Sequence, residues 1–230
     1  MFIIEQHKLI KEYIGFLSRK EFPCIAAKAA AERHQVKCMV AGNMACAKDD
    51  VAILHFIYEF VDVYRMATKP FHSAAVIFEQ PVIHCESEFD HFFWQRLQSL
   101  SNLDAQKYAY DTRVNPDPFS GNFSFSLKSE AFFIIGLHPC NSRISRQFSY
   151  PVIVFNPHAE FVKMRLTERY EKMKEVVRKK DVAFSGTINP MLDDFGTTSE
   201  VYQYSGKNYD ANWQCPLKIN HGSAENNSTP

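Results

Sequence analysis

Two histidines of this sequence directly follow short apolar segments, each beside a proline. His138 comes after the apolar run 131–135, and His158 comes after the run 152–155. Such runs are typical of buried strands, and the loops at strand ends hold side chains where water and ligands can reach them. These loops are the first candidates for a working site, although a hydrogen-bonded loop histidine would give the same pattern at His138.

The residues before His158 have the order of a helix start. Asn156 is a good N-cap, and Pro157 suits the first helical position. The free N–H groups of the first turn would then lie near His158 and attract an anion.

Two arginines lie between the two histidines. Arg143 and Arg146 are three residues apart and would share one face if this stretch is helical. Paired guanidinium groups bind carboxylates or propionates bidentately. Solvated arginines on a surface are the other interpretation.

A cysteine near the amino terminus has a comparable setting. Pro23 indicates a helix start, and residues 25–31 are rich in strong helix formers. Cys24 would then lie in the first turn, where the helix dipole favours a thiolate. A buried structural thiol is the alternative.

Composition limits the classes of function. Lys and Arg together number 26, as do Asp and Glu, so no net charge attracts nucleic acid or an anionic membrane. The six cysteines have no Cys-x-x-Cys spacing, which argues against a zinc ribbon or a redox dithiol. No secretory signal and no apolar stretch of about 20 residues is present, so we expect a soluble, cytoplasmic protein. The 20 phenylalanines suit an ordinary core or a pocket for a large flat ligand.

Hydrophobic periodicity predicts one α/β domain over residues 1–221, with a disordered polar tail at 222–230. Its mixed sheet of about five strands would be covered by helices. The expected strands are 36–40, 74–78, 123–127, 131–135 and 152–155. The expected helices are 2–17, 25–31, one capped by Asp49 and Asp50, one through 89–100, 157–166 and 168–180. Parallel strands 131–135 and 152–155 would bring His138 and His158 to one edge of the sheet, whereas antiparallel neighbours would separate them.

With these residues described, the chain resembles the YqcI/YcgG family, especially a branch of haem-dependent guanidine N-hydroxylases of the pre-guanitoxin type. The resemblance spans roughly residues 20–216 and is carried by Phe22-Pro23-Cys24, 88–97 with Phe93-Trp94, Gly136-Leu137-His138-Pro139, Ser142-Arg143 with Arg146, Phe155-Asn156-Pro157-His158, Asn189-Pro190-Met191-Leu192, Phe195-Gly196, Ser199-Glu200 and Gln203-Tyr204-Ser205-Gly206. It implies a protein that binds haem b and, with O2 and an external electron donor or redox partner, hydroxylates a guanidine or related nitrogen of an amino-acid-like small molecule.

The resemblance also suggests how the residues divide the work. His138 would bind the iron, with Cys24 as the rival ligand and His158 as a further candidate. Arg143 and Arg146 would hold the haem propionates beside Asn156 and His158. Glu200 would pair with the substrate's guanidinium, and Tyr202 or Tyr204 would donate a hydrogen bond in the pocket.

Two other functions stay open. One is a haem carrier or sensor that uses the same pocket without activating oxygen. The other is a haem-free protein that binds a small anion at the His158 helix start and Arg143.

Overall fold

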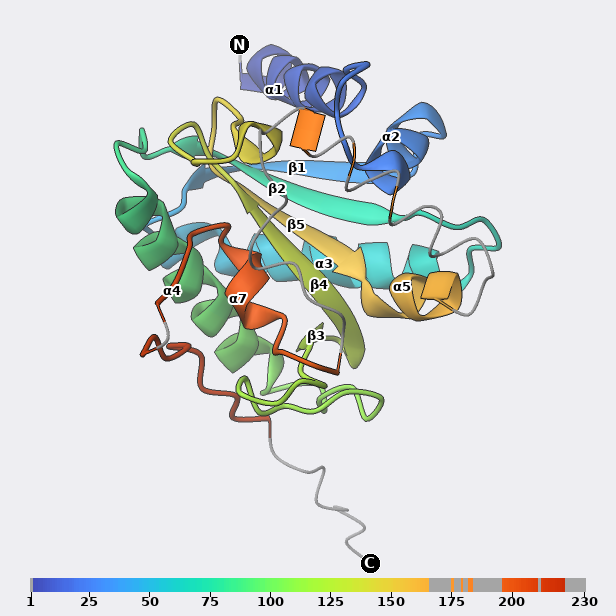
Figure 1. The fold of residues 1–230 in the computed structure, drawn as a ribbon, viewed down its shortest axis with the longest axis vertical. Helices are drawn as coiled ribbons and strands as arrows, with labels where there is room; N and C mark the ends of the chain where they lie inside the picture. Colours follow the sequence, from blue (N-terminus) through green and yellow to red (C-terminus); the bar gives the residue numbers. More distant parts are fainter. Residues whose placement is uncertain are drawn as a thin grey trace, which may run out of the picture.

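The computed structural model of this chain describes residues 2–165, 175, 179, 182–183, 196–210 and 212–221. Its helices and strands, coloured along the chain in Figure 1, are α1 (Phe2–Leu17), α2 (Ile25–Glu32), β1 (Val36–Asn43), η1 (Ala47–Asp49), α3 (Asp50–Arg65), β2 (Ser73–Gln80), α4 (Glu86–Asp104), β3 (Phe125–Leu127), β4 (Glu130–Leu137), η2 (Ile144–Arg146), β5 (Val152–Pro157), α5 (His158–Arg165) and α7 (Val201–Tyr204).

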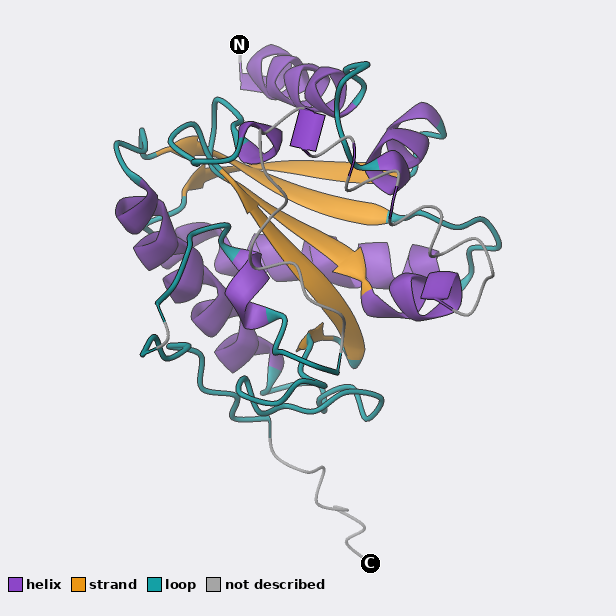
Figure 2. Ribbon diagram, in the orientation of Figure 1, coloured by secondary structure: helices purple, strands orange, loops and turns teal. Residues whose placement is uncertain are grey.

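The strands form one five-stranded mixed sheet, ordered β1-β2-β5-β4-β3 (Figure 2). Strands β1 and β2 are parallel, and all other neighbours are antiparallel. The predicted mixed sheet of about five strands in an α/β fold is therefore confirmed.

The side chains of β4 alternate between two hydrophobic cores. Phe132 and Ile134 join the larger core, which includes residues of α3 and α4. Ile135 and Leu137 point to the opposite face, where they pack with residues of α1 and α2. The central strands are thus buried on both faces, which explains why their sequences are almost continuously apolar.

Gly136 marks a close approach between the sheet and α4. A Cβ at this position would lie 2.7 Å from the Phe89 ring and 3.1 Å from the Phe93 ring. The two phenylalanines are completely buried, and burial of each such side chain stabilises the fold by roughly 1.5–3 kcal/mol. Glycine at this point lets α4 seat two aromatic rings directly on the strand that leads to His138.

Several predicted boundaries were wrong in detail. The first strand runs on to Asn43, and the third includes only Phe125–Leu127 of 123–127. Asp49 precedes α3, but its carboxylate accepts the Gly42 N–H at 2.7 Å and makes no side-chain cap on the helix. Asn156 and Pro157 belong to β5, so α5 begins one residue later than expected, at His158. The predicted helix 168–180 falls almost wholly, and the tail 222–230 wholly, outside the described residues.

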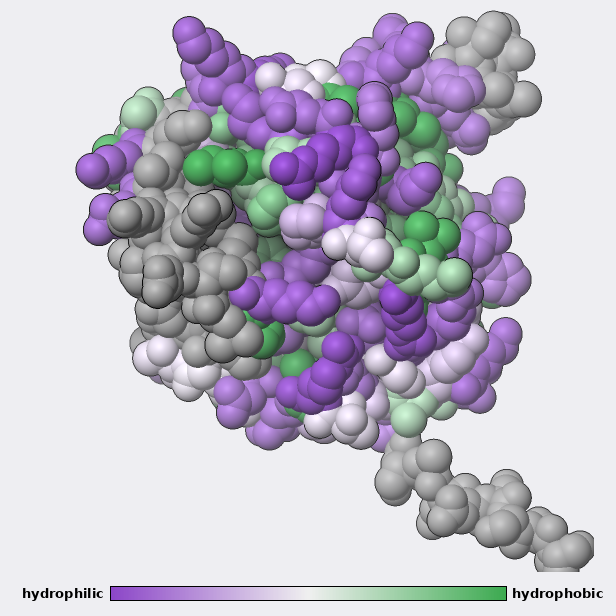
Figure 3. Space-filling view, turned by 90° about the vertical axis from the view of Figure 1, so that its right-hand side faces the viewer, coloured by the Kyte–Doolittle hydropathy of each residue, from purple (hydrophilic) through white to green (hydrophobic). Residues whose placement is uncertain are grey.

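The face of the molecule seen in Figure 3 is largely hydrophilic, with small apolar patches between polar side chains. Within the described ranges, none of the helices is both long and apolar enough to span a membrane.

Candidate functional site

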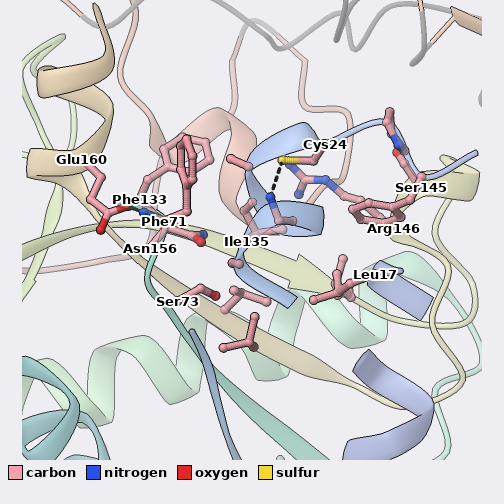
Figure 4. Close-up of a pocket in the computed structure, with 18 of the residues that line it drawn as sticks. Leu17, Cys24, Phe71, Ser73, Phe133, Ile135, Ser145, Arg146, Asn156 and Glu160 are labelled. Atoms are coloured by element: carbon pink, nitrogen blue, oxygen red, sulfur yellow. Dashed lines mark hydrogen bonds between the residues drawn. The ribbon is translucent and has the colours of Figure 1, made fainter. Parts of the chain in front are cut away.

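A pocket of about 270 Å³ lies on the sheet face that α1 and α2 cover. This volume is close to the lower end of the range for small-molecule sites. Its walls are mostly apolar and come from segments far apart in the sequence (Figure 4). The apolar walls include Leu17, Phe22, Phe133, Ile135, Leu137 and Val154. The polar positions include Cys24, Arg143, Arg146, Asn156, Glu160 and Gln203.

Cys24 lies in the pocket wall at the start of α2. It is the N-cap residue, one position before the first turn in which we expected it, and its backbone is extended (φ −78°, ψ 105°). The Ala27 N–H donates to Cys24 Sγ at 3.4 Å, drawn as a dashed line in Figure 4. The small side chains of Ala26 and Ala27 line the same wall. A helix N-terminus and a donated N–H both favour the thiolate, which is the form that binds metals.

Arg143 and Arg146 line this pocket together. Arg143 precedes the short 3-10 turn Ile144–Arg146, so the expected helix is only a single turn. Arg143 itself has an extended backbone (φ −99°, ψ 122°), yet both side chains line the pocket. Both are buried, and Arg146 also donates from Nη1 to the Tyr204 carbonyl at 3.1 Å. The interpretation of these arginines as solvated surface residues is wrong.

His138 points away from the pocket, into the core beside α4. Its ring stacks on Phe89 with centroids 4.2 Å apart, and only 1% of the residue is exposed. Asn141 Nδ2 lies 3.1 Å from His138 Nε2, and Nδ1 has no hydrogen-bond partner. Burial, helped by the charge of Arg146, lowers the pKa of His138 to about 4. His138 is therefore a neutral, packed histidine that is not among the residues of the pocket wall.

His158 lies at the other end of the β4–β5 pair. The register joins Leu137 to Val152 and Phe132 to Pro157, so the loops of His138 and His158 leave opposite edges of the sheet. The ring of His158 is buried, and its Nδ1 lies 3.5 Å from Glu200 Oε1. The antiparallel arrangement rules out one small site that contains both histidines.

The other predicted residues near His158 divide between the core and the pocket. Asn156 lines the pocket and donates from Nδ2 to the Phe133 carbonyl at 3.2 Å, instead of capping α5. Glu200 is buried, and its Oε2 accepts from Ser124 Oγ at 3.0 Å and Tyr204 Oη at 3.2 Å. Glu200 thus joins a core hydrogen-bond cluster.

The two predicted tyrosines also lie outside the pocket wall. Tyr204 is completely buried, and its hydroxyl accepts the Phe125 N–H at 3.1 Å. Burial and the nearby Glu200 raise the Tyr204 pKa well above its usual value. Tyr202 is half-buried against Trp213, with ring centroids 5.2 Å apart. The motif 189–192 and Phe195 lie outside the described residues.

Sequence reasoning missed a carboxylate in the pocket wall, Glu160. It lies in the first turn of α5, and with Asn156 it is on the far side of the pocket from Cys24 and Arg146 in Figure 4. One sequence signal for Glu160 is its place four residues after Asn156, in the first turn of the predicted helix 157–166. First-turn carboxylates are common for helix-dipole reasons alone, so that signal is weak.

By residue type, the pocket wall could hold a haem through Cys24, whereas His138 is not among its residues. A cysteine thiolate is one of the protein ligands of haem iron, and guanidinium groups such as those of Arg143 and Arg146 pair with carboxylates such as propionates. Within the described part of the chain, no three His, Cys, Asp or Glu side chains cluster as a metal site. One protein ligand is enough for haem, because the porphyrin supplies the other donors.

Comparison with known proteins covers nearly the whole chain. The sequence is 26% identical over 200 residues to the protein described as uncharacterized protein YqcI of Bacillus subtilis (strain 168). The matched region covers 84% of this chain and 77% of that protein. No solved structure matches. The sequence pattern of the YqcI/YcgG family matches residues 13–218, so this chain belongs to the YqcI/YcgG family.

Proposed function

We propose that this protein is a haem-dependent N-hydroxylase, a monooxygenase that acts on a guanidine or related nitrogen of an amino-acid-like substrate. The observation that carries the proposal is the position of Cys24, at a helix start in the wall of an apolar pocket that Arg143 and Arg146 also line. In this proposal Cys24 would hold the haem iron through its sulfur.

Thiolate ligation suits this reaction better than imidazole ligation. A thiolate pushes electron density on to the iron, and this promotes cleavage of the O–O bond. His138 has the weaker claim, because its ring is packed against Phe89 and turned away from the cavity.

The haem, when bound, would supply oxygen activation with two electrons from an external donor. One oxygen atom would enter the N–OH product, and the other would leave as water with two protons. The chain's own residues would do the remaining work. Arg143 and Arg146 would bind the propionates bidentately, and the apolar walls would exclude water from the reacting nitrogen.

The axial ligand is tested with the absorption spectrum of the ferrous carbonyl form of haem-loaded protein. Thiolate ligation moves the main band strongly to longer wavelength. We expect this band in the wild type and in His138→Phe, and its loss in Cys24→Ser. Cys46→Ser is the matched control, because Cys46 is exposed. A long-wavelength band that survives in Cys24→Ser, or its absence from the wild type, would reject Cys24 as the ligand.

The reaction is tested by supplying O2, a reductant and L-arginine or agmatine, with detection of hydroxylated product by mass spectrometry. Product that depends on haem and on Cys24 would support the N-hydroxylase. Haem binding without product from any guanidine or amine would favour a carrier or sensor. Protein that neither carries iron nor gains thermal stability with haem would contradict the proposal and favour a haem-free anion-binding function.

A further inference from the structure

The pocket has a negatively charged end that is distinct from its arginine end. Glu160 and His72 both line it, and their side chains are 13% and 12% exposed. The backbone N–H groups of Phe71 and His72 donate to the Glu160 carboxylate, and His72 Nδ1 lies 3.2 Å from Oε1. Figure 4 shows Glu160 near Phe71 and Phe133, well apart from Cys24 and Arg146.

No lysine or arginine of the described residues pairs with Glu160. Its only charge partner there is His72, with no Lys or Arg within ion-pair distance. The Gln35 amide nitrogen lies 3.1 Å from His72 Nε2. The described partners of the Glu160 carboxylate are thus two backbone N–H groups and one histidine ring, beside a mostly apolar wall. A cationic group of a ligand would add a charge-assisted partner that no lysine or arginine of the described residues supplies.

We propose that Glu160 binds the positively charged group of the ligand, a guanidinium or an alkylammonium, and so determines the specificity of the pocket. Phe133 and Phe161 line the same pocket, and aromatic faces attract organic cations; the ring of Phe71 already has Arg33 Cζ at 5.7 Å from its centroid. A charge-assisted bond to Glu160 would orient such a group, and a guanidinium would match the carboxylate bidentately.

This inference rests on the proposed function in one respect: the ligand is taken to be the substrate. Cys24 and Glu160 lie toward opposite ends of the same pocket, so a ligand cation held by Glu160 would share the cavity with the group that Cys24 would hold.

Glu160 takes over the role that the sequence suggested for Glu200. Glu200 is buried with Ser124, Tyr204 and His158 around its carboxylate, and it is not among the pocket-lining residues. A substrate could reach Glu200 only by disrupting that cluster. Glu160 is already at the cavity.

The test compares the binding of L-arginine, agmatine and L-citrulline by calorimetry, with and without haem. Citrulline has almost the shape of arginine but is neutral at the reacting end. We expect the wild type to bind both guanidinium compounds, with arginine at least tenfold tighter than citrulline, and Glu160→Gln to lose this preference. Glu160→Asp keeps the charge and should keep the preference, which distinguishes lost charge from damaged folding. Glu59→Gln is the matched control, because Glu59 is exposed on α3 and is not in the pocket wall.

The outcomes of this test separate the inference from the proposed function. Loss of the arginine preference in Glu160→Gln, with unchanged haem absorbance and thermal unfolding, supports the inference. An unchanged preference in Glu160→Gln, or no binding of arginine and agmatine by the wild type, overturns it. Failure of the wild type to bind haem would reject the proposed function alone, since calorimetry without haem still reports on Glu160.

Discussion

Gly206 lies directly against Arg146. A Cβ on Gly206 would be 2.9 Å from Arg146 Cδ and Nη1, and 2.7 Å from Asn141 Nδ2. Its φ of +88° is in the left-handed region, which glycine adopts more readily than other residues. The segment after α7 therefore positions a pocket arginine by backbone contact.

Gly206→Ala should destabilise the protein and weaken haem binding together. The added methyl group meets two side chains and the backbone is strained, so we expect a loss of about 1–3 kcal/mol in the free energy of unfolding. Urea denaturation measures that loss, and haem titration measures the displacement of Arg146. The control is Gly15→Ala on the exposed side of α1, where a Cβ would meet nothing within 4 Å. This control should gain roughly 0.5–1 kcal/mol from helix propensity. Equal effects of the two substitutions would contradict the assignment.

Arg146→Lys should lower haem affinity even though the charge is kept. A lysine ammonium cannot reproduce the two-pronged contact of a guanidinium with a carboxylate, and a charge-assisted hydrogen bond contributes about 1.5–3 kcal/mol. We therefore expect haem affinity to fall roughly tenfold or more. Competition with an apo-haem-binding protein provides the measurement. Arg19→Lys serves as the control, because Arg19 is exposed and is not among the residues that line the pocket. An affinity that does not change in Arg146→Lys would remove Arg146 from the propionate site.

The two apolar strands of the site could be predicted from the sequence, but their relative direction could not. Residues 131–135 and 152–155 are apolar on both faces, and a continuous apolar run is compatible with either direction. The position of Cys24 was predicted to within one residue because Pro23 and the alanine-rich segment after it are strong local signals. Local residue patterns indicate where a helix or strand lies. The relative direction of β4 and β5, which local patterns do not give, determines whether the loops after them lie close together.

The pocket itself required tertiary information. Its wall combines Cys24, Phe133 and Arg146 with His72 and Glu160, which are brought together by the crossing of distant elements. The place of His138 directly after an apolar strand favours it as the ligand from sequence alone. Side chains alternate between the two faces of β4, and His138 follows Gly136 on to the face that α4 covers. Its ring therefore packs against Phe89 of α4 and does not line the pocket on the other face.

A buried ion pair between α3 and α4 gives a prediction about stability alone. Arg96 Nη1 lies 2.7 Å from Asp50 Oδ1, Ser99 also donates to this carboxylate, and both charged side chains are almost fully buried. Burial raises the pKa of Asp50, although Ser99 and Arg96 oppose the effect. Removal of one partner leaves a buried charge, so Arg96→Met should cost about 3–5 kcal/mol in the free energy of unfolding.

The double variant Asp50→Leu/Arg96→Met removes both charges and should recover much of this loss. A double-mutant cycle by chemical denaturation measures the coupling between the two residues. Additive losses in the double variant would show that the pair does not act as a unit.

The depressed pKa of His138 predicts a specific pH dependence of stability. The folded protein protonates His138 only near pH 4, whereas the usual histidine pKa is 6.5. Between these two pH values the unfolded chain binds more protons, so the free energy of unfolding rises with pH. The contribution of His138 is fully present above pH 6.5 and is lost as the pH falls to about 4; it amounts to at most about 3 kcal/mol.

His138→Phe keeps a ring on Phe89 but cannot titrate, so its unfolding free energy should change less across this range than that of the wild type. Urea denaturation at several pH values provides the comparison, with His55→Phe at an exposed position of α3 as the control. Parallel pH profiles for the wild type and His138→Phe would mean that His138 has the same pKa in the folded and unfolded states. That result would contradict the lowered pKa that follows from its burial against Phe89.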